Sequence, residues 1–194
     1  MKKGQVSQWI RTHYPAYYQM NDYPADRTVV VGTTREEWGI LGNFGLSALV
    51  VDGVPFDCSE RIFQIMKLTD PAVRRAVYVY PKNPWMKKLA NKHEEAFRPD
   101  WGAIFIDALK FALMTKYEQC EAFRAELART GDRFIVERKH GKTLDSYCAE
   151  LSDDGTTWHG SNLLGRLLME LRDKGKLEYT LPEDALHFRD LLEE

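Results

Sequence analysis

The stretch Cys58-Ser59-Glu60-Arg61-Ile62-Phe63-Gln64-Ile65-Met66-Lys67 decides how this chain folds. Its apolar residues predict a helix over 60–68 that is held in the core. Glu60, Gln64 and Lys67 stand at positions i, i+4 and i+7, so they stack along one face of that helix. An acid, an amide and a cation in a row suit a site that cleaves a nucleotide. Charged residues at helical spacing more often only face water, so the stripe alone leaves both interpretations open.

Two short β elements are expected upstream of this helix. The β-branched run over 28–31 predicts a buried strand that ends at Gly32. Apolar runs over 48–51 and 54–56 flank Asp52-Gly53, and Asp-Gly between apolar runs is a strong hairpin signal.

Helices dominate the chain downstream. Ser59 is the expected cap of the first helix, and Asp70-Pro71 is expected to end it and start another. A basic amphipathic helix is predicted from Pro84. The segment 100–120 is apolar nearly all round, which is typical of a central helix.

The last third of the chain contains signals for the ends and beginnings of several helices and strands. Gly131 predicts a helix end, followed by a strand over 134–137. Ser161 or Asn162 is expected to cap the next helix, in which Gly165 indicates the close approach of a neighbour or a ligand. Pro182 is expected to start a final helix.

These elements predict an α+β, helix-rich single domain with a small β hairpin or sheet. We divide the chain into an aromatic N-terminal extension over 1–27, a central domain over 28–178 and a C-terminal helix extension over 179–194. The chain has 194 residues, of which 44% are hydrophobic and 12% aromatic, enough for one buried core.

Composition excludes several classes of protein. The net charge of −2 argues against a protein that coats nucleic acid. Cys58, Cys120 and Cys148 have neither zinc-ligand nor disulfide spacing, so we expect no metal, no cofactor and a cytoplasmic location. No signal peptide and no membrane span are expected.

Six elements in a fixed order resemble the NADAR (YbiA-like) family between about residues 30 and 172. They are Leu41-Gly42-Asn43-Phe44, the 51–56 hairpin, Glu60-x-x-x-Gln64-x-x-Lys67, Arg98-Pro99-Asp100-Trp101, Thr130-Gly131-Asp132, and the run from Trp158-His159-Gly160-Ser161-Asn162 to Arg172. The resemblance implies the NADAR fold and hydrolysis of an N-glycosidic bond to ribose. One branch of the family cleaves ribosylamino-pyrimidine phosphates of riboflavin synthesis, and another removes ADP-ribose from guanine in nucleic acid.

Both reactions pass through an oxocarbenium-like ribose, which needs a negative group near the sugar. By resemblance, the catalytic residues are Glu60 and Asp145. Asn43 and Phe44 line the pocket, Gln64 orients water or binds a ribose hydroxyl, and Trp101 stacks on the base. Lys67 and, as a weaker choice, Arg166 would bind phosphate. Tyr147 could stack on the substrate, and Asn162 would brace the pocket.

The chain departs from the family pattern in one element. Where the family has D-x-x-W-G, this chain has Asp145-Ser146-Tyr147-Cys148-Ala149, and Gly42 replaces the usual serine before Asn43. These changes leave the substrate open. The favoured function is metal-independent hydrolysis of an N-ribosyl bond in a small, phosphorylated, nucleotide-like molecule. The alternatives are an ADP-ribosyl-guanine hydrolase acting on nucleic acid and a non-catalytic module that binds ADP-ribose or a nucleotide. Oligomeric state and pathway stay open.

Overall fold

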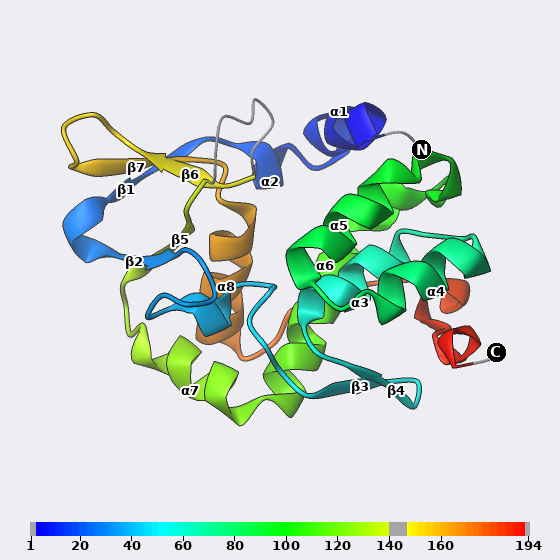
Figure 1. Cartoon of the computed structure of the whole chain (residues 1–194). Coiled ribbons are helices and arrows are strands. Elements are labelled where there is room, and N and C mark those ends of the chain that lie inside the picture. Colours follow the sequence, from blue (N-terminus) through cyan, green and yellow to red (C-terminus); the bar gives the residue numbers. More distant parts are fainter. Residues whose placement is uncertain (1–2, 140–146, 193–194) are drawn as a thin grey trace. The chain divides into compact units, whose positions relative to one another are not determined.

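This computed structural model describes residues 3–139 and 147–192, and the chain forms two compact units (Figure 1). The first unit comprises Met1–Trp9, Asn43–Glu121 and Glu178–Glu194. The second comprises Ile10–Gly42 and Ala122–Leu177, so helix α1 (Lys3–His13) has residues in both. Helices and small sheets together confirm the expected α+β, helix-rich fold.

The first unit is built around α3 (Ser59–Met66), which packs against three other helices (Figure 1). These are α4 (Pro71–Val79), α5 (Asn83–Lys92) and α6 (Trp101–Gln119). All of α3 is buried, including its polar residues. A solvated face is therefore excluded for the Glu60–Gln64–Lys67 stripe.

The ends of α3 and α4 are held by two buried arginines. Arg61 on α3 donates to the carbonyl oxygens of Val77, Tyr78 and Tyr80 at the end of α4, at 2.8–2.9 Å. Arg74 on α4 donates to the carbonyl oxygens of residues 65 and 68 at the end of α3, at 3.3 and 3.2 Å. Each helix thus supplies donors to carbonyl groups at the end of the other, where the Ile65 carbonyl also accepts from the Leu68 nitrogen at 3.0 Å.

The expected starts of these helices are partly confirmed. Asp70 caps α4, because its carboxylate accepts a hydrogen bond from the Val73 nitrogen at 2.9 Å. The expected Ser59 cap is wrong. Cys58 occupies the cap position of α3, and the Ser59 hydroxyl donates to the Asn43 carbonyl at 3.2 Å.

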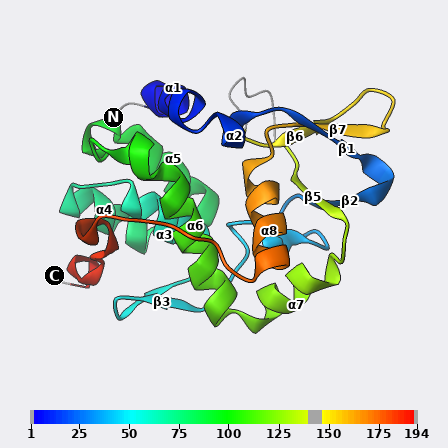
Figure 2. The ribbon, with the colours of Figure 1, turned by 180° about the vertical axis from the view of Figure 1, so that it is seen from behind.

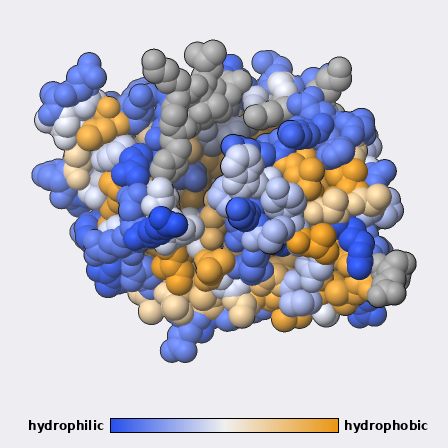
Figure 3. Space-filling view, viewed as in Figure 1, coloured by the Kyte–Doolittle hydropathy of each residue, from blue (hydrophilic) through white to orange (hydrophobic). Residues whose placement is uncertain are grey.

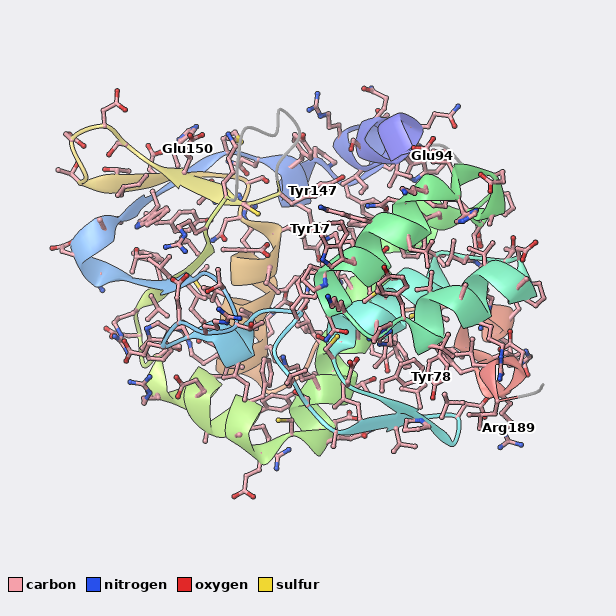
Figure 4. The ribbon with its side chains drawn as sticks, viewed as in Figure 1. Tyr17, Tyr78, Glu94, Tyr147, Glu150 and Arg189 are labelled. Carbon is pink, nitrogen blue, oxygen red and sulfur yellow. The ribbon has the colours of Figure 1, made fainter. Side chains whose placement is uncertain are left out.

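The hairpin is confirmed as β3 (Leu49–Val51) and β4 (Val54–Phe56), which pair antiparallel. Asp52 and Gly53 adopt φ values of 50° and 79°, as a two-residue type I′ turn requires. Tyr78 of α4 donates to the Pro55 carbonyl at 3.1 Å, which fastens the hairpin to the helices (Figure 4).

The helix expected from Pro182 is wrong. The chain forms two 3-10 turns there, η4 (Glu183–Leu186) and η5 (Arg189–Leu191). Between them Phe188 is fully buried, with its ring centre 5.5 Å from that of Phe56. Burying this ring bends the chain where a continuous helix was expected.

The second unit contains two small sheets and two longer helices (Figure 2). In one sheet β1 (Asn21–Pro24), β7 (Thr157–Gly160) and β6 (Ala149–Leu151) are antiparallel in that order. In the other, the two predicted strands, β2 (Thr28–Val31) and β5 (Phe134–Glu137), pair in parallel. The N-terminal segment also holds α2 (Pro15–Tyr18); β1, which follows it, was not foreseen. The remaining elements are α7 (Glu121–Arg129), α8 (Leu163–Lys174) and the 3-10 turns η1 (Ala25–Arg27), η2 (Gly39–Leu41) and, in the first unit, η3 (Glu94–Ala96).

Helix α8 lies very close to β5. A Cβ placed on Gly165 would stand 2.1 Å from the Ile135 carbonyl oxygen and 2.4 Å from Asn162 Oδ1. The close neighbour that Gly165 was expected to indicate is confirmed, and it is the backbone of β5.

The surface of the protein carries both hydrophilic and hydrophobic residues. Hydrophilic residues cover much of the face shown in Figure 3, with hydrophobic ones between them. No helix in the described ranges has the length and apolar character needed to cross a membrane.

Helix α6 carries a lysine into the core of the first unit. Lys116 is fully buried, and its Nζ donates to the Gly45 carbonyl at 3.1 Å. Burial lowers the pKa of Lys116 from 10.5 to about 8, because the charged form loses its hydration. The buried ammonium therefore opposes folding at neutral pH while it fixes the loop that begins at Asn43.

We expect Gly165→Ala to destabilise the second unit by about 2 kcal/mol or more, although alanine favours a helix over glycine by about 1 kcal/mol. The added methyl group collides with backbone that belongs to β5. Chemical denaturation measures the effect. Gly4→Ala in α1 is the matched control, since its Cβ would meet nothing within 4 Å. Equal stability of the two variants would contradict the close packing.

We expect Lys116→Met to change how stability depends on pH. The folded pKa of about 8 lies below the unfolded value of 10.5, so the folded state binds fewer protons between these values and wild-type stability rises with pH across that window. Relative to Lys116→Met, the wild-type free energy of unfolding should rise by about 1 kcal/mol from pH 7.5 to pH 9. Urea titrations at both pH values test this, and parallel pH profiles would refute it.

Candidate active site

The polar face of α3 forms a continuous line of hydrogen bonds inside the first unit. Gln64 Nε2 donates to Glu60 Oε1 at 2.9 Å, and Lys67 Nζ donates to Gln64 Oε1. The three residues are only 3–4% exposed. The predicted spacing therefore brings an acid, an amide and an ammonium group into direct contact.

Helix α5 supplies two further polar groups that were not assigned from the sequence. Lys87 Nζ lies 2.9 Å from Glu60 Oε1, and Lys67 Nζ donates to Asn91 Oδ1 at 2.7 Å. Lys87 and Asn91 are four residues apart, so they share one face of α5. The signal that could have found them is this spacing within the predicted basic helix.

The turn that carries Asn43 and Phe44 lies against the first turn of α3. The Asn43 carbonyl accepts a hydrogen bond from the Glu60 nitrogen at 2.9 Å. Both side chains are half-buried, and Lys87 Nζ lies 5.5 Å from the centre of the Phe44 ring. The Asn43 amide nitrogen has no hydrogen-bond acceptor within the part of the chain that the structure describes. Asn43, Phe44 and Glu60 thus lie together at the start of α3.

Trp101 is part of the core of the same unit. It is 2% exposed, and its ring centre lies 5.1 Å from Phe63 and 5.6 Å from Phe105. Its packing stabilises the side of α3 that carries Phe63, next to the polar line. Stacking of Trp101 on a base stays a prediction, which needs Phe63 or Phe105 to move aside.

The other predicted residues lie in the second unit. Asn162 stands at the start of α8 with a φ of 48°, but its side chain does not cap that helix. Its amide accepts from the Glu137 nitrogen at 2.9 Å and donates to the Ile135 carbonyl at 2.8 Å. Asn162 therefore braces β5 against α8, and the expected side-chain cap is wrong.

Arg166 and Tyr147 contact the N-terminal segment of the second unit. Arg166 donates to the carbonyl oxygens of Ala16 and Gln19. The ring of Tyr147 meets that of Tyr18 edge-on, with ring centres 5.9 Å apart, and Figure 4 shows Tyr147 on its segment before β6. Their predicted contacts with substrate stay predictions. Asp145 lies outside the described residues.

Few groups near Glu60 could act as a nucleophile or a metal ligand. Burial, with the neighbouring Asp57 charge adding to it, raises the pKa of the Cys58 thiol to about 12, so this cysteine is neutral and a poor nucleophile. In the described ranges no three His, Cys, Asp or Glu side chains gather as a metal site. The carboxylate of Glu60 is held by an amide and an ammonium donor, and its catalytic role stays a prediction.

Comparisons with known proteins agree on one family. N-glycosidase YbiA of Escherichia coli (strain K12) is 29% identical over 146 residues, which are 75% of this chain and 87% of the relative. A protein named "Riboflavin biosynthesis protein" from Vibrio vulnificus (strain YJ016) is 25% identical over 181 residues, or 92% of this chain. The chain spans about half of that relative, 47% of its length.

The fold comparison points the same way. The NMR structure of the E. coli protein YbiA matches with a TM-score of 0.63 and 27% sequence identity, covering 77% of this chain and 84% of that chain. The NADAR domain matches residues 7–175, which is most of the sequence. The chain therefore belongs to the NADAR family.

Proposed function

We propose that this chain, an N-glycosidase of the NADAR family, hydrolyses the N-ribosyl bond of a small, phosphorylated, nucleotide-like substrate without a metal ion. The favoured substrates are ribosylamino-pyrimidine phosphates. The observation that carries the proposal is the Glu60 carboxylate, which is 3% exposed, held by Gln64 and Lys87, and adjacent to the Asn43–Phe44 turn. The relatives named N-glycosidase support the type of reaction, and the name of the riboflavin biosynthesis relative is the reason for testing these substrates first.

The reaction needs one negative group beside the ribose. As the bond from the anomeric carbon to the base nitrogen breaks, positive charge develops on the sugar, and a nearby carboxylate stabilises that charge. Water then forms the new bond to the anomeric carbon, and its proton passes to the carboxylate or to the departing base. We assign both roles to Glu60, because its hydrogen-bond donors fix its orientation before substrate arrives.

Neighbouring groups would hold the substrate. The Asn43 amide can bind a ribose hydroxyl, and the half-buried Phe44 ring can stack on the base. Asp145 is retained as a second catalytic carboxylate only from the family pattern. Three free cysteines fit a reducing compartment, so we expect the reaction to take place in the cytoplasm.

The function is tested with two substrates in the presence of a chelator. We expect ribose phosphate to be released from ribosylamino-pyrimidine phosphate in excess EDTA, because the mechanism needs no metal. ADP-ribosylated guanine in nucleic acid is the parallel substrate, assayed for free ADP-ribose. Release only of ADP-ribose would favour the alternative hydrolase, and activity that EDTA abolishes and one divalent ion restores would refute the mechanism. Binding of ADP-ribose without release of either product would favour a binding module.

We expect Glu60→Gln to lower turnover by about a hundredfold or more, because it removes the negative charge near the ribose. The amide can still accept from Gln64, and Lys87 stays half-exposed, so stability should change by less than about 1 kcal/mol. Turnover and the thermal midpoint are measured on the same preparation. Glu95→Gln is the matched control, an exposed residue whose partner is His93. If both variants turn over like the wild type, Glu60 only stabilises the helix.

A further inference from the structure

Lys87 links the buried Glu60 carboxylate to the surface of the first unit. Its Nζ lies 2.9 Å from Glu60 Oε1, and the side chain of Lys87 is 46% exposed while that of Glu60 is 3% exposed. An ion pair with one half-exposed member is weak, because water competes for the ammonium group. Lys87 can therefore exchange part of this contact for another anion at little cost.

Lys67, the cation expected to hold phosphate, is placed differently. It is 4% exposed, donates to Gln64 and Asn91, and lies 4.6 Å from the centre of the Phe97 ring. Binding of an external phosphate by Lys67 would break hydrogen bonds in the interior, which is costly. The geometry therefore favours Lys87 over Lys67 as the contact for a charged ligand.

The surroundings of Lys87 suit a ribosyl phosphate. The one carboxylate and two ammonium groups of Glu60, Lys67 and Lys87 sum to a charge of +1, which an anion complements. The Phe44 ring lies 5.5 Å from Lys87 Nζ and offers an apolar face next to the cation. The long, flexible side chain of lysine lets the ammonium group move away from Glu60 and still stay in reach of it.

We propose that Lys87 binds the phosphate of the substrate and thereby selects phosphorylated over unphosphorylated ribosides. The inference rests on the proposed function and adds the residue that recognises the phosphate. When the Lys87 ammonium group binds the phosphate, Gln64 Nε2 still donates to Glu60 Oε1 and keeps the carboxylate in place. Lysine acts here as a point charge, which is its usual mode of phosphate binding.

The test is calorimetric titration with ribose 5-phosphate, which does not depend on turnover. Lys87→Met should weaken binding by tenfold or more, and Lys87→Arg should stay within about threefold of the wild type, because the charge is kept. Lys88→Met is the matched control, since Lys88 is the next residue on α5 and lies over Trp85, 4.1 Å from its ring centre. Unphosphorylated ribose should bind far more weakly, and equally so to wild type and Lys87→Met.

Kinetics on the favoured substrate give an independent check. Lys87→Met should raise KM for ribosylamino-pyrimidine phosphate by tenfold or more, whereas Lys88→Met should leave that KM unchanged. The proposal is overturned if the wild type does not bind ribose 5-phosphate, or if Lys87→Met and Lys88→Met bind it equally well. If the wild type binds ribose 5-phosphate through Lys87 but cleaves neither substrate, the proposed function fails while the assignment of Lys87 stands.

Discussion

The burial of charge on α3 is the constraint on which the first unit depends. Glu60 and Lys67 are buried in a helix that has no solvent-facing side, and buried charges are stable only when hydrogen-bonded partners replace water. Gln64 connects the two, and α5 completes the set with Lys87 and Asn91. The polar contacts between α5 and α3 thus also hold the Glu60 carboxylate in position.

Burial also decides which groups near the site can react. Cys58 directly precedes α3, yet its thiol pKa is raised to about 12, so it stays neutral. Burial lowers the pKa of Lys116 to about 8, and its ammonium group holds the Gly45 carbonyl by a hydrogen bond. Both residues shape the loop and helix start around Glu60.

Features with local causes could be predicted from the sequence. The Asp52-Gly53 turn, the Asp70 cap and the apolar α6 depend on neighbours in the chain, and all three are as expected. Features with distant causes could not. The strand β1 has no β-branched residue and forms only by pairing with β7, more than a hundred residues away. Ser59 binds the Asn43 carbonyl instead of capping its helix, because the chain folds back on it.

In the candidate site, too, contacts within one helix could be predicted and contacts between distant segments could not. Glu60, Gln64 and Lys67 share a helix, so their spacing predicted their contact. Lys87 pairs with Glu60 across two helices, and nothing in the 58–67 stretch indicates which basic residue is its partner. Family resemblance indicated the Asn43–Phe44 turn, and the structure adds how the Glu60 nitrogen holds it.

The two buried arginines have a consequence for how this chain folds. Arg61 donates to carbonyl groups at the end of α4 and Arg74 donates to carbonyl groups at the end of α3, so each helix supplies hydrogen-bond donors to the last turn of the other. Such mutual dependence makes the pair one cooperative folding unit, whose amide protons exchange with solvent through a shared opening event. Since α3 also carries Glu60, the carboxylate is positioned only after α3 and α4 have formed together.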